Sequence, residues 1–231
     1  MQHVTSAKLN KVIKDWKRPA QLGRGSSTSG GRQKIRLLVL AGRKKSGKDV
    51  LLSYVLEKYP GFKHYRIAEA PIRIAEILEL PPERKILHAL FGVNKLLHPL
   101  LGESAYKRRV AKILDRERPR LAIVEAVRTK EEYEEFVVKR KGILVGTKAD
   151  DLVRYGRSLA DAKKREKQDE SKMSFQEFMA RERHPTEREI DWITNRAHFI
   201  LDNSHDKKTP FYGAIDKIMR RLGFKKKTRR R

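Results

Sequence analysis

A glycine-rich segment carries the most specific chemistry in this sequence. Residues 42–49 read Gly-Arg-Lys-Lys-Ser-Gly-Lys-Asp, which matches the pattern G-x-x-x-x-G-K between an expected strand and an expected helix. Gly42 and Gly47 allow the backbone to turn tightly, so that successive N–H groups point at phosphate oxygens. The helix N-terminus adds partial positive charge, and Lys48 can reach the β- and γ-phosphates. The segment therefore predicts a loop that binds a nucleoside triphosphate.

The position after Lys48 departs from the usual pattern of such loops. It is ordinarily Ser or Thr, whose hydroxyl binds Mg²⁺, but here it is Asp49, followed by Val50. Two interpretations follow: Asp49 binds the metal directly or through water, or the site has lost ordinary metal chemistry. The expected ATP contacts in this segment are Gly42, Arg43, Lys44, Lys45, Ser46, Gly47, Lys48, Asp49 and Val50.

Further charged residues follow other apolar runs. Glu125 ends the run that begins at Arg120, and Arg128 comes three residues later. A carboxylate at the carboxyl end of a central strand can hold Mg²⁺ through water or orient an acceptor, while a planar guanidinium suits phosphate. Arg154 and Arg157 are three residues apart, so they lie on one face of an expected helix.

The elements that would position these side chains alternate along the chain. Compact apolar runs predict strands over 34–41, 64–68, 120–125, 142–147 and 196–201. Helical patterns cover 48–58, 71–80, 83–116 with breaks near Gly92 and 98–102, 130–139, most of 150–190, and 211–222. Strands that are nearly all apolar and alternate with helices predict an α/β fold with about five parallel strands covered on both faces.

Composition excludes several classes of protein. The chain has 231 residues, 39% of them hydrophobic, which suffices for one core. It has no cysteine, which excludes disulfides, thiolate metal sites and cysteine nucleophiles. No apolar run is long enough for a membrane span, and no apolar signal segment opens the chain. We therefore expect a cytoplasmic protein without membrane contact.

Positive charge is concentrated at the two ends. The formal net charge is +26, from 55 Lys and Arg against 29 Asp and Glu. We expect residues 1–33 to be a basic flexible extension, in which 5–16 has the apolar spacing of a short amphipathic helix, and 223–231 to be a basic tail. Because basic tails attract polyanions, nucleic acid or the ribosome is a candidate partner.

The region between the ends resembles a known group of kinases. The loop G-x-x-x-S-G-K-D resembles that of phage-type deoxynucleoside monophosphate kinases and of animal-type phosphomevalonate kinase. Residues 34–222 are similar to the former and to related small P-loop nucleotide kinases. The matching stretches are Gly42–Asp49, Ile67–Arg73, Ile123–Arg128, Asp151–Arg157, Met173–Phe178 with Glu182–Glu189, and Ala197–Asn203. The resemblance implies a three-layer P-loop NTPase fold with a helical lid over about 150–190.

The same resemblance implies roles for individual residues. Lys48, Arg154 and Arg157 would neutralise the charge of the γ-phosphoryl group as it moves from ATP to a nucleoside or deoxynucleoside monophosphate. Mg²⁺ would be held with the help of Asp49 and Glu125, although Glu125 replaces the family's Asp. Arg73 and Arg128 would bind the acceptor phosphate, and Asn203 would lie near the adenine. Further acceptor contacts are sought among His88, Asn94, Lys95 and Arg109.

Two alternatives stay open from the sequence. One is an RNA- or ribosome-associated P-loop protein with weak or no kinase activity, which the basic ends and the altered metal residue favour. The other is a kinase of another small phosphorylated acceptor, such as phosphomevalonate or dephospho-coenzyme A, because the loop itself does not select the acceptor. The sequence does not determine the oligomeric state.

Overall fold

A computed structural model describes residues 6–17, 35–81, 84–125, 127–164, 171–183, 185–205 and 208–227. The strands are β1(Arg36–Gly42), β2(Phe62–Arg66), β3(Leu121–Glu125), β4(Ile143–Lys148) and β5(Phe199–Asp202). The helices are α1(Ser6–Lys17), α2(Lys48–Lys58), α3(Glu69–Ile77), α4(Arg84–Leu101), α5(Ala105–Glu117), α6(Lys130–Tyr133) with the π-helical turn η1(Glu134–Lys139), α7(Asp151–Lys164), α9(Phe175–Glu182), α10(Pro185–Thr194) and α11(Lys208–Arg221).

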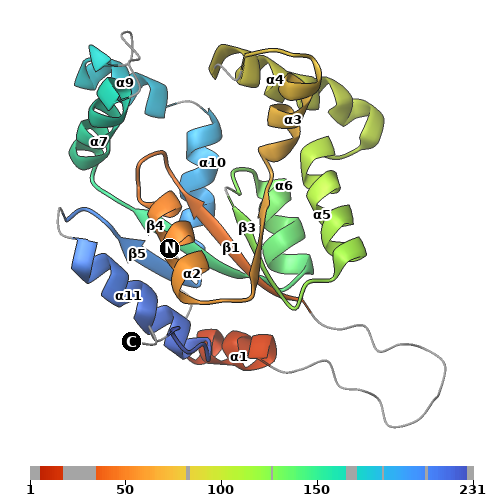
Figure 1. The fold of residues 1–231 in the computed structure, drawn as a ribbon, viewed down its shortest axis with the longest axis vertical. Coiled ribbons are helices and arrows are strands. Elements are labelled where there is room, and N and C mark those ends of the chain that lie inside the picture. The colour runs from red at the N-terminus through yellow and green to blue at the C-terminus, as the bar shows by residue number, and fades with distance from the viewer. Residues whose placement is uncertain are drawn as a thin grey trace.

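The five strands form one parallel sheet in the order β2-β3-β1-β4-β5 (Figure 1). The central strand β1 pairs with β3 so that Leu40 lies beside Glu125, and with β4 so that Gly42 lies beside Thr147. All strands point the same way, so their carboxyl ends share one edge, which we call the carboxyl edge. The five strands predicted from apolar runs are confirmed, as is the α/β P-loop fold.

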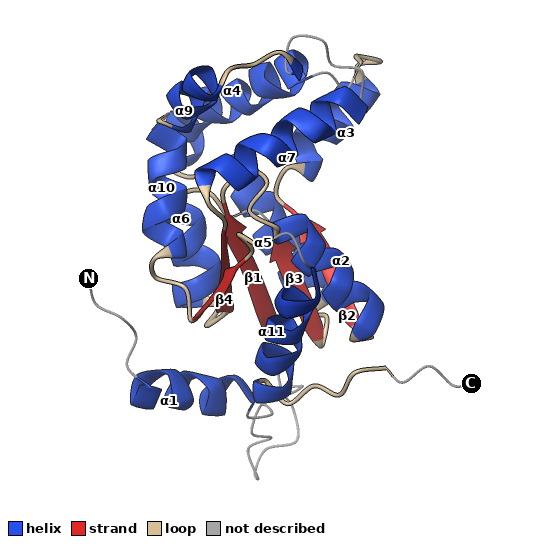
Figure 2. Cartoon of the chain, turned by 90° about the vertical axis from the view of Figure 1, so that its left-hand side faces the viewer, coloured by secondary structure: helices blue, strands red, loops and turns tan. Residues whose placement is uncertain are grey.

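Helices cover both faces of the sheet and complete three layers. On one face, α1, α2 and α11 pack against alternate strand residues such as Leu38 and Leu40. On the other face, α5, η1 and α10 pack against Leu37 and Val39. This division follows from the strand period of two, since both faces of a parallel sheet must be buried. Figures 1 and 2 show the two helical layers from perpendicular directions.

Parts of both basic ends pack against the rest of the protein, which the sequence did not predict. The helix expected over 5–16 is present as α1, and its residues Leu9, Ile13 and Trp16 are buried in the main core. Phe224, beyond the expected end of the domain, contacts the ring of Trp16 at 5.8 Å between centroids. The expectation of a flexible extension is therefore wrong for Ser6–Lys17, because an apolar stripe on this basic helix reaches the sheet. Residues 18–34 and 228–231 lie outside the described parts of the chain.

Two expectations about helices also need correction. Helix α4 runs continuously past Gly92 and Pro99, and the break comes only at Gly102, whose φ is +67°. The expected lid spanned 150–190, but α10 packs against β1 and β4 and buries Ile190 and Ile193. α10 therefore belongs to the layer on the sheet, and a lid that comprises α7 and α9 stays a prediction. Within the described residues, no helix is both long and apolar enough to cross a bilayer.

Candidate active site

The glycine-rich segment forms a tight loop between β1 and α2. Gly47 has φ +105° immediately before α2, and an added Cβ there would lie 2.2 Å from the side-chain nitrogen of Asn203. At Gly42 an added Cβ would lie 2.3 Å from Thr147 Oγ1 and 2.7 Å from Ser46 Oγ. Both positions thus require glycine for close packing as well as for backbone conformation.

The underside of the loop is held by polar side chains from β4 and the segment after β5. Ser46 Oγ lies 2.7 Å from Thr147 Oγ1 and donates to the carbonyl oxygen of Arg43 at 2.8 Å. The amide nitrogen of Asn203 donates to the carbonyl oxygen of Ser46 at 3.2 Å. Asn203 is buried and lies against Gly47, so the structure places it beneath the phosphate loop. The sequence had placed it near the adenine.

Lys48 extends from the first turn of α2 toward the carboxyl edge. Its Nζ lies 3.0 Å from Asp49 Oδ1 and 3.8 Å from Glu125 Oε1. The side chain of Lys48 is 11% exposed and that of Asp49 is 82% exposed. The structure thus brings Lys48, Asp49 and Glu125 together, while the neighbouring Val50 packs against the core.

Glu125 is surrounded by positive groups. Its Oε2 lies 2.9 Å from Nε2 of His64 and accepts a hydrogen bond from Nε of Arg66 at 3.2 Å. Burial alone would raise the pKa of Glu125, but the His64 hydrogen bond and the charges of Lys48 and Arg66 outweigh it and lower the pKa to about 2. Glu125 therefore stays ionised at neutral pH and can fix the position of Lys48.

His64 and Arg66 were not among the residues expected at the site. They are two apart on β2, so both project from the same face of the strand toward β3 and Glu125. The sequence could have predicted that His64 and Arg66 share a face, because side chains two residues apart on a strand point the same way. Nothing in the sequence predicted that Thr147 contacts Ser46 beneath the loop, because this contact depends on the pairing of β4 with β1.

The two lid arginines lie against the phosphate loop. Arg154 Nη1 donates to the carbonyl oxygen of Lys44 at 3.2 Å and to Glu182 Oε2 at 2.5 Å, and Nη2 donates to Asp151 at 2.6 Å. Its side chain is 1% exposed. Arg157 Nη1 donates to the carbonyl oxygen of Lys45 at 3.3 Å. In this arrangement both arginines hold the loop backbone, and Arg154 is enclosed by its own partners.

Loop side chains make the reciprocal contacts to the helices around them. Arg43 Nε donates to Asp191 of α10 at 2.7 Å, and its Nη1 donates to the same Glu182 oxygen at 3.0 Å. Lys45 pairs with Asp161 of α7 at 2.9 Å. Lys44 is exposed. Glu182 therefore joins Arg43 of the loop to Arg154 of α7. The sequence did not predict this role, because Glu182 lies in a highly charged stretch.

Glu187 of α10 is a second acidic group that sequence reasoning missed. One of its carboxylate oxygens is buried without a hydrogen-bond partner. Burial and the nearby charge of Glu182 raise the pKa of Glu187, against the opposing charges of Arg128, Arg43 and Arg154. These three arginines therefore lie close to one acidic group beside the loop.

The two residues expected to bind the acceptor phosphate follow β2 and β3 at the carboxyl edge, on separate segments. Arg73 of α3 is exposed and pairs with Glu69 at 2.7 Å. Arg128 is exposed just after β3, and its backbone nitrogen donates to Glu132 at 2.7 Å. In Figure 1, α3 and α4 stand on one side above the carboxyl edge, and α7 and α9 stand on the other.

The additional acceptor candidates divide into different roles. Asn94 is structural, because its Oδ1 accepts from the backbone nitrogen of Ala105 at 2.8 Å and so holds the start of α5. Arg109 Nη2 lies 3.8 Å from Glu69 Oε1, and the side chain of Lys95 is exposed on α4. The side chain of His88 is outside the described part of the structure.

A magnesium ion would have few protein ligands here. The described residues contain no group of three or more His, Asp or Glu side chains that could hold a metal. Mg²⁺ in kinases needs only one or two carboxylates, because the nucleotide phosphates and water complete its coordination. The exposed carboxylate of Asp49 fits that requirement, whereas Glu125 is already bonded to His64 and Arg66.

Comparison with known proteins agrees with this geometry at the level of the fold. No protein-family model matches the chain, and no curated protein matches it. The crystal structure of TT1252 from Thermus thermophilus matches with 17% identity and a TM-score of 0.50, covering 80% of this chain and 94% of that one. Shikimate kinase from Bacteroides thetaiotaomicron matches with 14% identity and a TM-score of 0.50, covering 80% and 97%. These likenesses show that this chain has a three-layer α/β P-loop fold. The fold does not identify the phosphoryl acceptor, which has to be inferred from the residues of the site.

Proposed function

We propose that this protein transfers the γ-phosphoryl group of ATP to a small phosphorylated acceptor. The observation that carries the proposal is Lys48, which begins a helix directly after a loop whose two glycines have no room for a Cβ. Such a loop presents backbone N–H groups and a helix N-terminus to phosphate. Glu125 and Asp49 hold the Lys48 ammonium group beside that loop.

The catalytic contribution of the chain would be positioning and charge neutralisation. Phosphoryl transfer requires little covalent chemistry from the protein, so most of the rate comes from electrostatics and alignment. Lys48 would contact the β- and γ-phosphates, and Arg157 would lie beside them. Arg154 would act by holding the loop and lid together. Mg²⁺ held through Asp49 would supply further neutralisation of the phosphate charge.

The acceptor that we favour is a nucleoside or deoxynucleoside monophosphate, with phosphomevalonate or dephospho-coenzyme A as alternatives. The exposed Arg73 and Arg128 offer guanidinium groups for an acceptor phosphate on the β2–β3 side of the loop. All three acceptor classes carry such a phosphate. The choice between them rests on the resemblance in sequence and needs a direct assay.

The test is an ATP consumption assay with Mg²⁺ and a panel of these acceptors, beside a Lys48→Ala control. We expect ADP and one phosphorylated product with one acceptor, and loss of both in the control by roughly 10²-fold or more. A matched control, Lys58→Ala at the far end of the same helix, should retain activity. ATP binding without transfer to any acceptor would overturn the proposal for that panel.

A second candidate function is association with nucleic acid through the basic ends. The observation in its favour is that α1 and the C-terminal segment meet, because Arg221 donates to Asn10 at 2.7 Å. Lys8, Lys11, Lys14 and Lys17 are exposed on α1. Salt-sensitive RNA binding that falls when Lys11 and Lys14 become glutamine would support it.

A further inference from the structure

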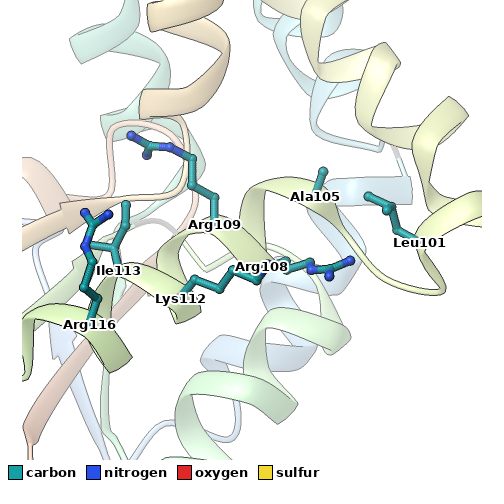
Figure 3. A pocket seen from close by; sticks show the side chains of 7 residues that line it. All are labelled: Leu101, Ala105, Arg108, Arg109, Lys112, Ile113 and Arg116. Carbon is teal, nitrogen blue, oxygen red and sulfur yellow. The ribbon is translucent and has the colours of Figure 1, made fainter.

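The outer face of α5 carries an open basic groove of about 790 Å³. We call it the α5 groove. Figure 3 shows that all but one of its lining residues come from α5, the exception being Leu101 at the end of α4. Its residues are Leu101, Ala105, Arg108, Arg109, Lys112, Ile113 and Arg116. The lining has four cations, three apolar side chains, and no acidic or aromatic residue.

Three of the four cations of the groove make long ion pairs at its rim. Arg108 Nε lies 3.5 Å from Glu103 Oε1, Arg109 Nη2 lies 3.8 Å from Glu69 Oε1, and Arg116 Nη2 lies 3.9 Å from Glu117 Oε1, all longer than an ordinary N–H···O hydrogen bond. Among the described ion pairs, none includes Lys112. Like charges on successive turns of a helix repel each other, so this arrangement disfavours the free helix. A bound anion would remove that repulsion.

The cations follow one line along the helix. Arg108, Lys112 and Arg116 are spaced by four residues, so they lie on one face and span about 12 Å at 1.5 Å per residue. Cations in line on one helix face suit a polyanion whose phosphates also follow a line. Because α5 leads directly into β3, Arg108 lies toward the carboxyl edge and Arg116 toward the opposite edge of the sheet.

The positive surface continues past the end of α5. Arg118 and Arg120 are exposed in the connection to β3. Burial lowers the pKa of Arg36, and the nearby charge of Arg120 lowers it further. Arg36 in turn stacks on Trp16 and Phe224, at the junction of α1 and the C-terminal segment. The basic residues of α5 therefore lead toward the basic ends of the chain.

We propose that the α5 groove binds the sugar-phosphate backbone of an RNA strand. An open groove that continues into further cations fits a polymer better than a compact ligand. The lack of aromatic lining favours contact with phosphates, since sequence-tolerant binding of unpaired bases ordinarily uses aromatic stacking. The proposal does not depend on the kinase function, because the groove contains none of the loop residues and shares with the acceptor candidates only Arg109.

The test is salt-dependent binding of a labelled single-stranded RNA of mixed sequence to the full chain, between about 50 and 200 mM salt. The variant replaces Arg108, Arg109, Lys112 and Arg116 together with glutamine, which keeps helix propensity. A matched control replaces the exposed Lys163, Lys164, Arg181 and Arg183 of the lid region, with the same loss of charge. Thermal melting checks that both variants remain folded.

We expect the α5 variant to bind at least about tenfold more weakly and its salt slope to fall by up to about 3, since each phosphate contact on a single strand contributes about 0.7. The lid control should retain nearly the full slope. Equal losses in both variants would show that only net charge matters and would overturn the proposal. Displacement of the RNA by tripolyphosphate at equal phosphate concentration would also overturn it, in favour of a small anionic ligand. RNA binding that persists in Lys48→Ala would separate this site from the proposed kinase function.

Discussion

At the scale of single residues, the most informative groups are buried carboxylates with opposite pKa shifts. Glu125 lies among His64, Lys48 and Arg66, which lower its pKa to about 2. Glu132 is fully buried, and desolvation raises its pKa to about 7 although the backbone nitrogens of Arg128 and Thr129 donate to it. The first is held ionised beside Lys48. The second stabilises the turn that carries Arg128, at a cost that depends on pH.

This cost gives a prediction for Glu132→Gln. The pKa of Glu132 rises from 4.5 to about 7 on folding, so between these values the folded state binds more protons and the free energy of unfolding falls as pH rises. Glutamine can keep the capping contact without a charge. We expect the variant to gain stability relative to the native protein between pH 5 and 8, by on the order of 3 kcal/mol at most.

Urea unfolding of Glu132→Gln and of the native protein at pH 5 and at pH 8 would measure the difference in their free energies of unfolding. Glu134→Gln, an exposed carboxylate two residues away, is the matched control and should show no such gain. A stability difference between Glu132→Gln and the native protein that does not change with pH would contradict the prediction.

At the scale of elements, Glu182 at the end of α9 joins α7 to the phosphate loop. Its Oε2 accepts from Arg43 at 3.0 Å and from Arg154 at 2.5 Å. Removing one partner of a buried ion pair leaves an uncompensated charge, which typically costs about 3–5 kcal/mol. We expect Glu182→Gln to lower the free energy of unfolding by about 3 kcal/mol and to weaken ATP binding.

The measurement is denaturant unfolding together with ATP titration. Glu177→Gln on the same helix is the control, because Glu177 is exposed and glutamine can keep its capping contact with Ser174. The joining role of Glu182 would be disproved if the two variants lost stability to the same extent.

The sequence predicted the elements well and the side-chain contacts only in part. Four of the five strands follow apolar runs, whereas β2 is half polar and begins two residues before the expected segment 64–68. The loop follows its glycines and Lys48. The burial of Arg154 was not predictable, because it depends on α9 folding back over α7, where Arg154 lies 5.4 Å from the Phe178 ring. The packing of α10 on β1 was missed because Ile190 and Ile193 occur in a highly charged stretch.

At the scale of the whole molecule, α1 and the segment around Phe224 pack together against Arg36 at the start of β1. Trp16 of α1 is 2% exposed, and its indole nitrogen donates to the carbonyl oxygen of Leu37 at 3.2 Å. The guanidinium of Arg36 lies 4.3 Å from the Trp16 ring and 4.5 Å from the Phe224 ring. These contacts close the edge of the sheet opposite the phosphate loop, as Figure 2 shows for α1 and α11.

We therefore expect Trp16→Ala to lower the free energy of unfolding by about 3–5 kcal/mol, as is typical for the truncation of a buried aromatic side chain. Lys14→Ala, exposed on the same helix, is the control and should change stability by less than about 0.5 kcal/mol. Chemical denaturation of both variants provides the measurement. Equal stability of Trp16→Ala and the native protein would mean that α1 is dispensable for the core.

The stack of Trp16, Arg36 and Phe224 also bears on the order of events during synthesis. α1 is synthesised long before α11 and Phe224, yet it packs against both of them. Contacts between such distant positions carry a large loop-closure entropy and slow folding. Until α11 has been synthesised, the apolar stripe of α1 lacks this partner.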